Sequence, residues 1–576
     1  GYGTLPSAYP YRQYNTYSRT LKSTDVHTAV LENDYIKAVF LPDFGGRLWS
    51  LTDKTTGKNL LYTNDVIRFS NLSTRNAWFS GGVEWNMGII GHSPLSNDPL
   101  FTASGTTDSG VPFLRMYEYE RIREAEYQMD FWLEEKSRSL NCRMRIVNHT
   151  DQVIPMYWWS NMAVPEYPSG QIIVPAATAY TCKNWEVYKV NVPEVDGNNI
   201  FHYESIPDQI DYFFDIPYEC PKYIANVNKD GYGLLQTSTR RLRARKLFSW
   251  GHNEGSDRWQ HFLTEDAGPY IEIQAGLGKT QYGCLPMAPH TAWEWLEQYG
   301  PVHLPQTTSS QDNCQYIEQH VSSEELERLL QTSASFAHQK AAVVSSGSTH
   351  GAMRNLEATA SPKKKALSDH LDFGGCPENE WTHLLTKGSF VTADPDQIPG
   401  DFQCAAVYYE QLKKAVKTTD SENWYAYYHL GLMHWFHGKH KKARKMLERS
   451  LALQPSAWAY HGLAVLTFSD RDQRISYIQK GLALCNFDLS YVKEAFRILL
   501  LEEAFSELLD CYNHLPEQIQ TERRIHFCYL TALSKTGQYK KGYDLLMREP
   551  DYVLDDIREG EDSIGSLYSA LYEGVF

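Results

Sequence analysis

The sequence lacks the features that identify membrane, zinc-binding and disulfide-linked proteins. Its 576 residues contain no apolar run of membrane-spanning length, and the N-terminal GYGTLPSAYPY has no signal-peptide pattern. The ten cysteines are scattered, without a Cys-x-x-Cys pair or a Cys/His cluster at zinc spacing. We therefore expect no metal and a cytoplasmic protein; secretion stays open because the chain does not begin with methionine.

Positive charge is also scarce. The formal net charge is -15 at pH 7, whereas nucleic acids and anionic membranes attract concentrated Lys and Arg. We therefore expect neither of these partners. The sequence contains no phosphate-binding loop, dinucleotide fingerprint, nucleophile elbow or calcium loop, so it predicts no cofactor.

Aromatic residues are abundant. They make up 13% of the chain, with 15 Trp and 38 Tyr. Apolar ring faces beside polar groups suit sugar rings, so this composition fits a sugar or oligosaccharide ligand. A large β core packed with aromatics would produce the same composition.

Residues 1–300 are expected to form an all-β domain. Short β-branched and aromatic runs alternate with Gly, Pro, Asn and Asp at the intervals of a β-sandwich. The clearest predicted strands are 35–42, 142–148, 171–176, 241–250 and 270–276.

Two further regions follow. Residues 301–401 are expected to be a linker region with a helix that begins after Ser322, where Glu325 completes a capping box. Residues 402–576 have helical periodicity, and 424–456 fits the 34-residue tetratricopeptide template, with weaker copies at 458–485 and 523–547. Such repeats could support a homodimer or bind a protein partner.

Four stretches carry a resemblance to a known family. They are LPDFGGRLWSLTDKTTGKNLLY (41–62), FSGGVEWNMGIIGH (79–92), WWSNMAVP (158–165) and RWQHFLTEDAGPYIEIQAGLGKTQ (258–281). Their order resembles galactose mutarotase-like β-supersandwich domains, in particular a family of unassigned function fused to tetratricopeptide repeats. The resemblance implies carbohydrate chemistry, since that fold serves aldose 1-epimerases, glycoside hydrolase modules and lyase modules. The Asn-His-x-His-Gly signature of the epimerases is absent, and Gly-Gly-Val-Glu-Trp-Asn followed by His92 stands at the comparable place.

Glu84, Glu272 and His92 are the candidate catalytic residues. A glycosidase needs two carboxyl groups across one bond. On the strand YIEIQAG, Glu272 shares a face with Tyr270 and Gln274, and that face is either solvent surface or a site. His92 closes the motif that begins at Glu84.

The candidate substrate-binding residues are polar or aromatic side chains of the same stretches. Arg47 is either a ligand clamp or a turn arginine with an apolar stem. Adjacent strand residues face opposite ways, so we expect only one of Trp158 and Trp159 to line a cleft. The full set is Arg47, Trp85, Asn86, Trp158, Trp159, Asn161, His252, Trp259 and Gln274.

The function predicted from these residues is a glycoside hydrolase that acts on an oligosaccharide, with Glu84 and Glu272 as the acid/base pair. The alternative enzyme is an aldose 1-epimerase with Glu272 as base and His92 or His252 as acid. The remaining alternative is a non-catalytic sugar-binding or scaffold protein that uses its helical repeats.

Overall fold

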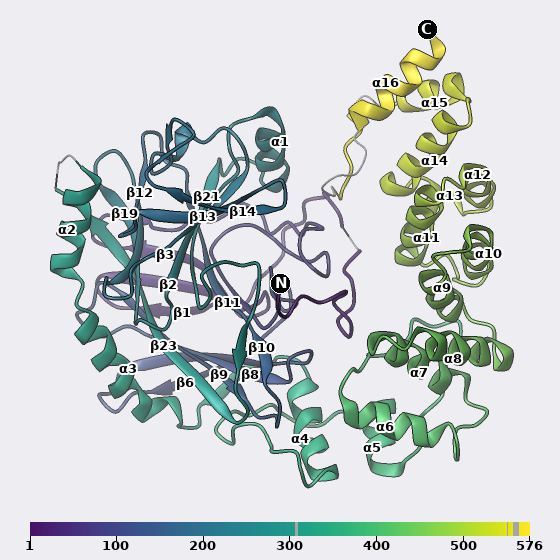
Figure 1. The fold of residues 1–576 in the computed structure, drawn as a ribbon, viewed down its shortest axis with the longest axis horizontal. Helices are drawn as coiled ribbons and strands as arrows, with labels where there is room; N and C mark the ends of the chain where they lie inside the picture. The colour runs from purple at the N-terminus through teal and green to yellow at the C-terminus, as the bar shows by residue number, and fades with distance from the viewer. Residues whose placement is uncertain (16, 306–308, 550, 557–563) are drawn as a thin grey trace. The chain divides into compact units, whose positions relative to one another are not determined.

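The chain folds into two compact units. The computed structural model describes residues 1–576 except 16, 306–308, 550 and 557–563. The first unit contains residues 1–8, 22–69 and 73–377, and the second contains residues 9–21, 70–72 and 378–576. The strands belong to the first unit, and the helical repeats belong to the second (Figure 1).

The first unit contains two large antiparallel sheets. The first sheet has the order β1-β2-β3-β5-β11-β21-β20-β17-β13-β14, with β4 beside β3. Its strands are β1 (Ala29–Glu32), β2 (Ile36–Leu41), β3 (Arg47–Asp53), β4 (Lys58–Asn59), β5 (Val83–Met87), β11 (Trp158–Pro165), β21 (Tyr270–Gly276), β20 (Ala244–Ser249), β17 (Ile210–Phe214), β13 (Thr178–Lys183) and β14 (Glu186–Asn191).

The second sheet has the order β12-β18-β19-β23-β9-β8-β7-β6-β24. Its strands are β12 (Gln171–Ile173), β18 (Lys222–Val227), β19 (Tyr232–Ser238), β23 (Thr291–His303), β9 (Leu140–Asn148), β8 (Ala125–Trp132), β7 (Pro112–Glu120), β6 (Phe101–Thr106) and β24 (Ala342–Ser345). Two short pairs are β10 (Ile154–Met156) with β22 (Leu285–Met287), and β15 (Glu194–Val195) with β16 (Asn198–Asn199).

Aromatic side chains join the two sheets. Trp85 of β5 packs on Phe131 of β8, with ring centroids 5.2 Å apart. Trp158 of β11 packs edge-on against Trp295 of β23 at 4.9 Å. Because strand side chains alternate, the neighbours of these core residues point away from the core. The predicted all-β supersandwich is confirmed, and its first sheet presents a second, polar face.

The segment from 301 to 401 contains more structure than the linker with one helix that the sequence predicts. It holds α2 (Ser310–His320), α3 (Ser323–Ala337), β24, α4 (His350–Ala360) and α5 (Glu380–Lys387). The hydroxyl of Ser322 accepts the Glu325 N–H at the start of α3. Leu326 and Phe336 of α3 join a cluster with Trp132 of the second sheet, so apolar burial holds α3 on the first unit, whereas α5 belongs to the second unit.

The second unit is a helical repeat, as predicted. The three repeat copies correspond to the pairs α7–α8, α9–α10 and α14–α15. Gly431 lets Leu447 approach the α7 backbone, because a Cβ at Gly431 would lie 2.8 Å from the leucine side chain. The helices are α6 (Ala406–Ala415), α7 (Trp424–Phe436), α8 (His440–Leu453), α9 (Ala457–Leu466), α10 (Arg471–Leu482), α11 (Leu489–Leu501), α12 (Phe505–Asn513), α13 (Glu517–Gln520), α14 (Arg523–Lys535), α15 (Tyr539–Leu546) and α16 (Ile564–Val575).

Among the described residues, no helix combines the length and the apolar composition needed to cross a membrane.

Leu447→Ala should destabilise the second unit. Leu447 is 1% exposed and fills the space between Gly431 and Gly462, so the truncation leaves a cavity and should cost about 2–5 kcal/mol. Chemical denaturation followed by far-UV circular dichroism measures this loss. Glu448→Ala on the exposed side of α8 is the control, and an equal loss in both variants would contradict the packing role of Leu447.

Candidate functional site

Polar side chains gather on three central strands of the first sheet. Asn161 of β11 lies opposite Glu84 of β5 on one side and opposite Gln274 of β21 on the other. Glu272 is two residues before Gln274 and therefore faces the same way. Neighbouring strands lie about 4.8 Å apart, so the β5 and β21 backbones are separated by about 10 Å. Side chains of carboxyl length can approach each other across that span.

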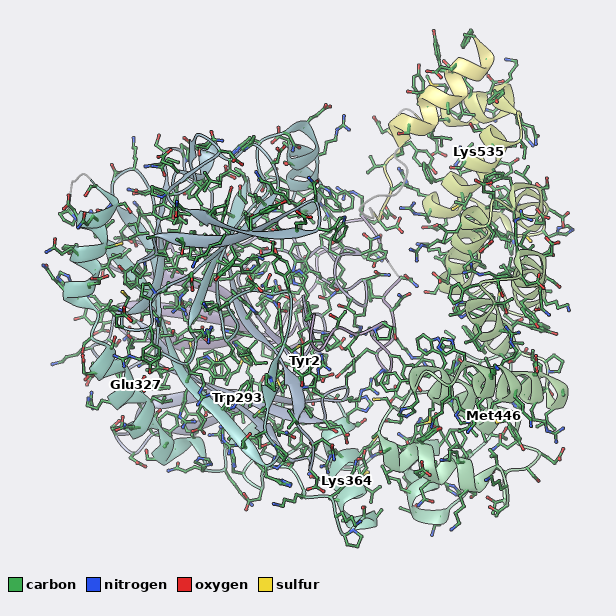
Figure 2. All side chains as sticks on the ribbon, viewed as in Figure 1. Tyr2, Trp293, Glu327, Lys364, Met446 and Lys535 are labelled. Carbon is green, nitrogen blue, oxygen red and sulfur yellow. The ribbon has the colours of Figure 1, made fainter. Side chains whose placement is uncertain are left out.

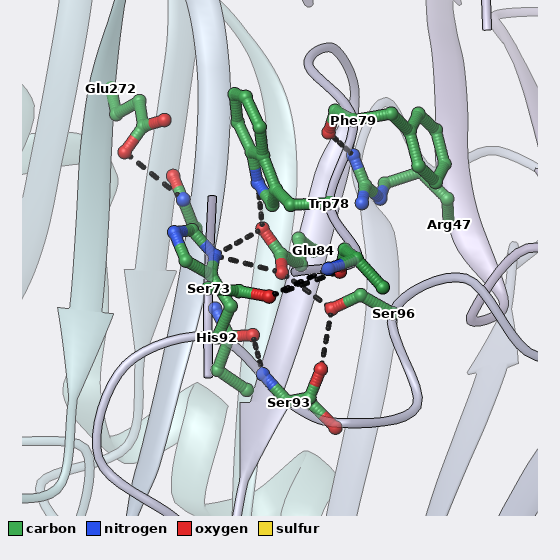
Figure 3. A network of polar contacts seen from close by, with 12 residues as sticks. Arg47, Ser73, Trp78, Phe79, Glu84, His92, Ser93, Ser96 and Glu272 are labelled. Carbon is green, nitrogen blue, oxygen red and sulfur yellow. Dashed lines mark hydrogen bonds and ion pairs between the residues drawn. The ribbon is translucent and has the colours of Figure 1, made fainter. Parts of the chain in front are cut away.

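Glu84 is held by three neighbours (Figure 3). His92 Nδ1 lies 3.0 Å from Oε1 and 3.1 Å from Oε2, the Trp78 indole N–H donates to Oε2 at 3.1 Å, and the Ser96 hydroxyl donates to Oε1 at 2.7 Å. The carboxylate is 5% exposed. Both of its oxygens are therefore occupied by donors of the protein itself.

The charges of Glu84 and His92 stabilise each other. Burial alone would raise the pKa of Glu84, but the charge and hydrogen bond of His92, the charge of Arg47 and the Ser96 hydrogen bond outweigh burial and lower the pKa to about 2. Burial opposes the charged form of His92, yet the Glu84 charge and hydrogen bond raise the pKa of the imidazole. Each group therefore favours the charged form of the other.

Glu272 has the opposite character. Burial raises the pKa of its carboxyl, and the Glu84 charge adds to the increase, while His92, Lys246 and the Asn161 hydrogen bond oppose it. Asn161 and Gln274 donate to the same oxygen, Oε2, at 3.0 and 2.9 Å. Oε1 takes neither of these bonds. The two carboxyl groups thus have pKa values displaced in opposite directions, which is typical of acid/base pairs.

A glycine turn places Arg47 beside these groups. The Arg47 guanidinium is 2% exposed, lies 3.8 Å from the Phe79 ring and donates through Nη1 to the carbonyls of Phe79 and Gly81, each at 2.8 Å. Gly82 has φ +69°, and a Cβ there would lie 2.3 Å from the Leu48 carbonyl. The Gly-Gly pair is therefore needed for the backbone to pass close to β3 and for its carbonyl to meet Arg47.

These residues enclose a cavity of about 10 Å³, the volume that one water molecule needs. Nη2 of Arg47 and Oδ1 of Asn161 are buried and have no hydrogen-bond partner among the described residues. The sequence predicts a cleft that could hold a sugar, whereas this cavity is too small for a sugar ring. The lining residues are Arg47, Trp78, Phe79, Gly81, Gly82, Glu84, Asn161, Ala163 and Glu272.

The tryptophans of the motifs lie in the protein interior. Trp85 and Trp158 face the second sheet, and Trp158 is fully buried. Trp159 is 1% exposed and packs on Phe213 at 5.7 Å. The expectation was that one of Trp158 and Trp159 would line a cleft, but neither presents an open ring face in this structure.

Asn86, His252 and Trp259 have structural partners elsewhere. Asn86 accepts the Ser93 N–H at 2.7 Å and so fixes the loop that carries His92. His252 pairs with Glu166, and Trp259 stacks on Trp250 with centroids 6.1 Å apart. None of the three lines the small cavity.

Four residues of the network were not predicted from the sequence. Trp78 and Ser96 flank the predicted motif and contact Glu84. Their closeness to Glu84 in the sequence is the one feature that could have identified them as its partners. Gln281 donates to Gln274 Oε1 at 2.7 Å, and Lys246 donates to Gln281 at 2.7 Å. The described residues contain no group of three or more His, Cys, Asp or Glu that could hold a metal ion.

Comparison with known proteins agrees with this architecture. Residues 4–292 match the model of a domain of unknown function, DUF5107. The chain belongs to this family. The match contains all three catalytic candidates, Glu84, His92 and Glu272.

Solved structures extend the comparison to the repeats. A TPR-domain containing protein from Parabacteroides distasonis is 20% identical, with 100% of this chain and 92% of that chain covered and a TM-score of 0.66. Its fold is therefore shared along the full length, from the DUF5107 domain through the helical repeats.

Two shorter structures align with about half of this chain. A galactose mutarotase-like protein from Clostridium acetobutylicum is 11% identical, with 49% of this chain and 99% of that chain covered and a TM-score of 0.37. A putative aldose 1-epimerase from Escherichia coli K12 is 12% identical, with 49% and 100% covered and a TM-score of 0.36.

Glu84→Gln should lower the pKa of His92. The Glu84 charge raises this pKa, whereas burial lowers it. The neutral amide of glutamine removes that charge, so burial should then lower the pKa of His92. Titration of the His92 ring by NMR measures the change. His252 is the internal control, because its carboxylate partner is Glu166. An unchanged His92 titration would contradict the pairing.

Proposed function

We propose that the DUF5107 domain is a carbohydrate-active enzyme that catalyses acid/base chemistry at the anomeric centre of a sugar, and that its reaction is epimerisation of an aldose. One observation carries the proposal. Both oxygens of Glu84 are hydrogen-bonded to His92, Trp78 and Ser96. Among the described residues, by contrast, Glu272 Oε1 accepts no hydrogen bond and His92 Nε2 makes none. The available proton acceptor and donor are therefore Glu272 and His92.

The chemistry follows from the two protonation states. Ionised Glu272 would take the proton of the anomeric hydroxyl while cationic His92 gives a proton to the ring oxygen, so that the C1–O5 bond breaks and an open-chain aldehyde forms. Rotation about the C1–C2 bond and reversal of both proton transfers would close the ring as the other anomer. A raised pKa makes Glu272 a stronger base, and the Glu84 charge keeps His92 protonated.

Arg47 and Asn161 are suited to orient the sugar. Each has a buried polar atom without a partner at the small cavity, one a donor and one an acceptor. Hydroxyl groups of a sugar can satisfy both kinds of atom. A sugar ring is larger than the present cavity, so binding would require Trp78 and Phe79 to move away from Glu84 and Arg47.

A glycoside hydrolase is the second candidate, and a specific observation favours it. Glu84 and Glu272 line the same cavity, and their pKa values are displaced in opposite directions. In that reaction Glu272 would protonate the leaving oxygen and Glu84 would act as base or nucleophile. Glu84 would then have to give up donors that it already holds, which is why we place epimerisation first.

Polarimetry and product analysis separate the two enzymes. We expect the purified chain to accelerate mutarotation of a free aldose without cleaving a disaccharide, and we expect Glu272→Gln to reduce the rate by about 10²–10⁴-fold. His92→Gln should cause a similar loss, whereas the control His252→Gln should leave the rate unchanged. Release of a new reducing end would favour the hydrolase. Sugar binding without turnover in all variants would favour a binding or scaffold protein.

The pH profile tests the roles of the two groups. Activity needs ionised Glu272 and protonated His92, so a plot of rate against pH should be bell-shaped. Its acidic limb should lie above the ordinary pKa of Glu, and its alkaline limb should lie above the ordinary pKa of His. Glu84→Gln should move the alkaline limb to lower pH, because the pKa of His92 falls, and should move the acidic limb less. A profile whose alkaline limb is the same in both proteins would rule out His92 as the acid.

A further inference from the structure

A second and larger cavity lies in the first unit. Its volume is about 820 Å³, and it shares no lining residue with the small cavity around Glu84 and Glu272. It opens at the ends of β13, β17, β20 and β21, where Leu277 and Ala244 form part of its wall. Cavities of this size hold ligands of several rings.

The walls of this cavity are strongly basic. They carry five cationic side chains and a single carboxylate, Asp215. Asp215 is already paired with Lys189 at 3.0 Å and with Lys279 at 3.2 Å. In a chain of net charge -15, such a cluster differs sharply from the average surface. The five cations are Lys222, Arg240, Arg241, Arg243 and Lys279.

The guanidinium groups of the three arginines have no carboxylate partner among the described residues, although the backbone N–H of Arg240 donates to Glu327 at 3.4 Å. Among the described residues, none forms an ion pair with the side chains of Arg240, Arg241 or Arg243. Burial, together with the nearby charges of Arg245 and Arg240, lowers the pKa of Lys222 to about 8. The three guanidinium charges of this cavity are therefore not neutralised by an ion pair with a described residue.

A buried arginine fixes the segment that carries these charges. Arg245 is fully buried and donates to the carbonyls of Leu242 and Ala244 at 2.8 and 3.0 Å. It also donates to the Lys222 carbonyl at 2.9 Å and to the Ser238 hydroxyl at 2.7 Å. The backbone that presents the arginines is thus held before any ligand binds, which lowers the entropy cost of binding.

Aromatic rings border the same cavity. The Arg241 guanidinium lies 5.8 Å from the ring of Trp293, which Figure 2 labels, and the Arg240 guanidinium lies 5.6 Å from the ring of Tyr218. Tyr218 is 75% exposed. A ligand in this cavity would therefore meet both cations and aromatic side chains.

We propose that this cavity binds an acidic oligosaccharide, a short sugar chain that bears carboxylate or sulfate groups. Guanidinium groups bind such anions through paired hydrogen bonds, and sugar rings pack on aromatic faces. A free inorganic anion would use only a fraction of the volume. The choice of a sugar rests on the proposed function, whereas the binding of an anion rests on the charges of the cavity alone.

Equilibrium binding of a fluorescently labelled trigalacturonate to the full chain tests the proposal. We expect binding that weakens as NaCl is added, and we expect the double variant Arg241→Gln/Arg243→Gln to weaken it by about tenfold or more. The charge-matched control is Lys136→Gln/Lys229→Gln, which removes two exposed lysines outside the cavity and should leave the affinity unchanged. Thermal unfolding of each variant checks that it folds.

Competing probes decide the class of ligand. Maltotriose, inorganic phosphate and a short single-stranded oligonucleotide should each compete more weakly than unlabelled trigalacturonate, and Trp293→Leu should weaken trigalacturonate binding more than phosphate binding. Equal affinity in the wild type and the double arginine variant would overturn the proposal. Tighter binding of the oligonucleotide or of phosphate would overturn the choice of a sugar.

The result is distinguishable from a failure of the proposed function. Glu272→Gln should abolish mutarotation and leave trigalacturonate binding unchanged, because Glu272 does not line this cavity. Conversely, the double arginine variant should lose trigalacturonate binding and keep mutarotation of a small neutral aldose.

Discussion

The alternation of side chains along β5 and β11 is the constraint on which both the core and the candidate site depend. Trp85 and Trp158 point toward the second sheet and pack on Phe131 and Trp295. Glu84, one residue before Trp85, and Asn161, three residues after Trp158, must therefore point to the other face. A slip of one residue would place a carboxylate among aromatic rings and an indole at the cavity, so the burial of the tryptophans also fixes the register of the site.

Burial explains why the site contains paired charges rather than single ones. An ionised carboxylate that is 5% exposed is costly unless donors surround it, and Glu84 has three. The same donors prevent it from accepting a proton at ordinary pH. Glu272, held by two neutral amides, remains able to exchange a proton. One sheet face thus carries one carboxylate that is paired with a histidine and one whose pKa is raised.

Local patterns in the sequence predicted the elements well. The helix pairs of the repeats, the Ser322 cap and the YIEIQAG strand all follow from spacing within one element, and the structure confirms them. The Gly-Gly pair is needed because the Leu48 carbonyl and the Arg47 side chain pass close to Gly82, and the sequence alone does not show which groups approach it. Contacts between segments far apart in the sequence are harder to predict. No spacing rule indicates that Lys246 donates to Gln281, or that Phe336 attaches α3 to the second sheet.

The cavity around Glu84 and the cavity around Arg241 differ in how their charges are balanced. Glu84 forms an ion pair with His92, and Arg47 and Glu272 form hydrogen bonds with backbone carbonyls and side-chain amides. Around Arg241 the cations outnumber the single carboxylate, Asp215, which two lysines already share. An anion that bound only the folded chain would stabilise it. The groups around Glu84 are therefore hydrogen-bonded within the protein, whereas the guanidinium groups around Arg241 would gain an ionic partner from a bound anion.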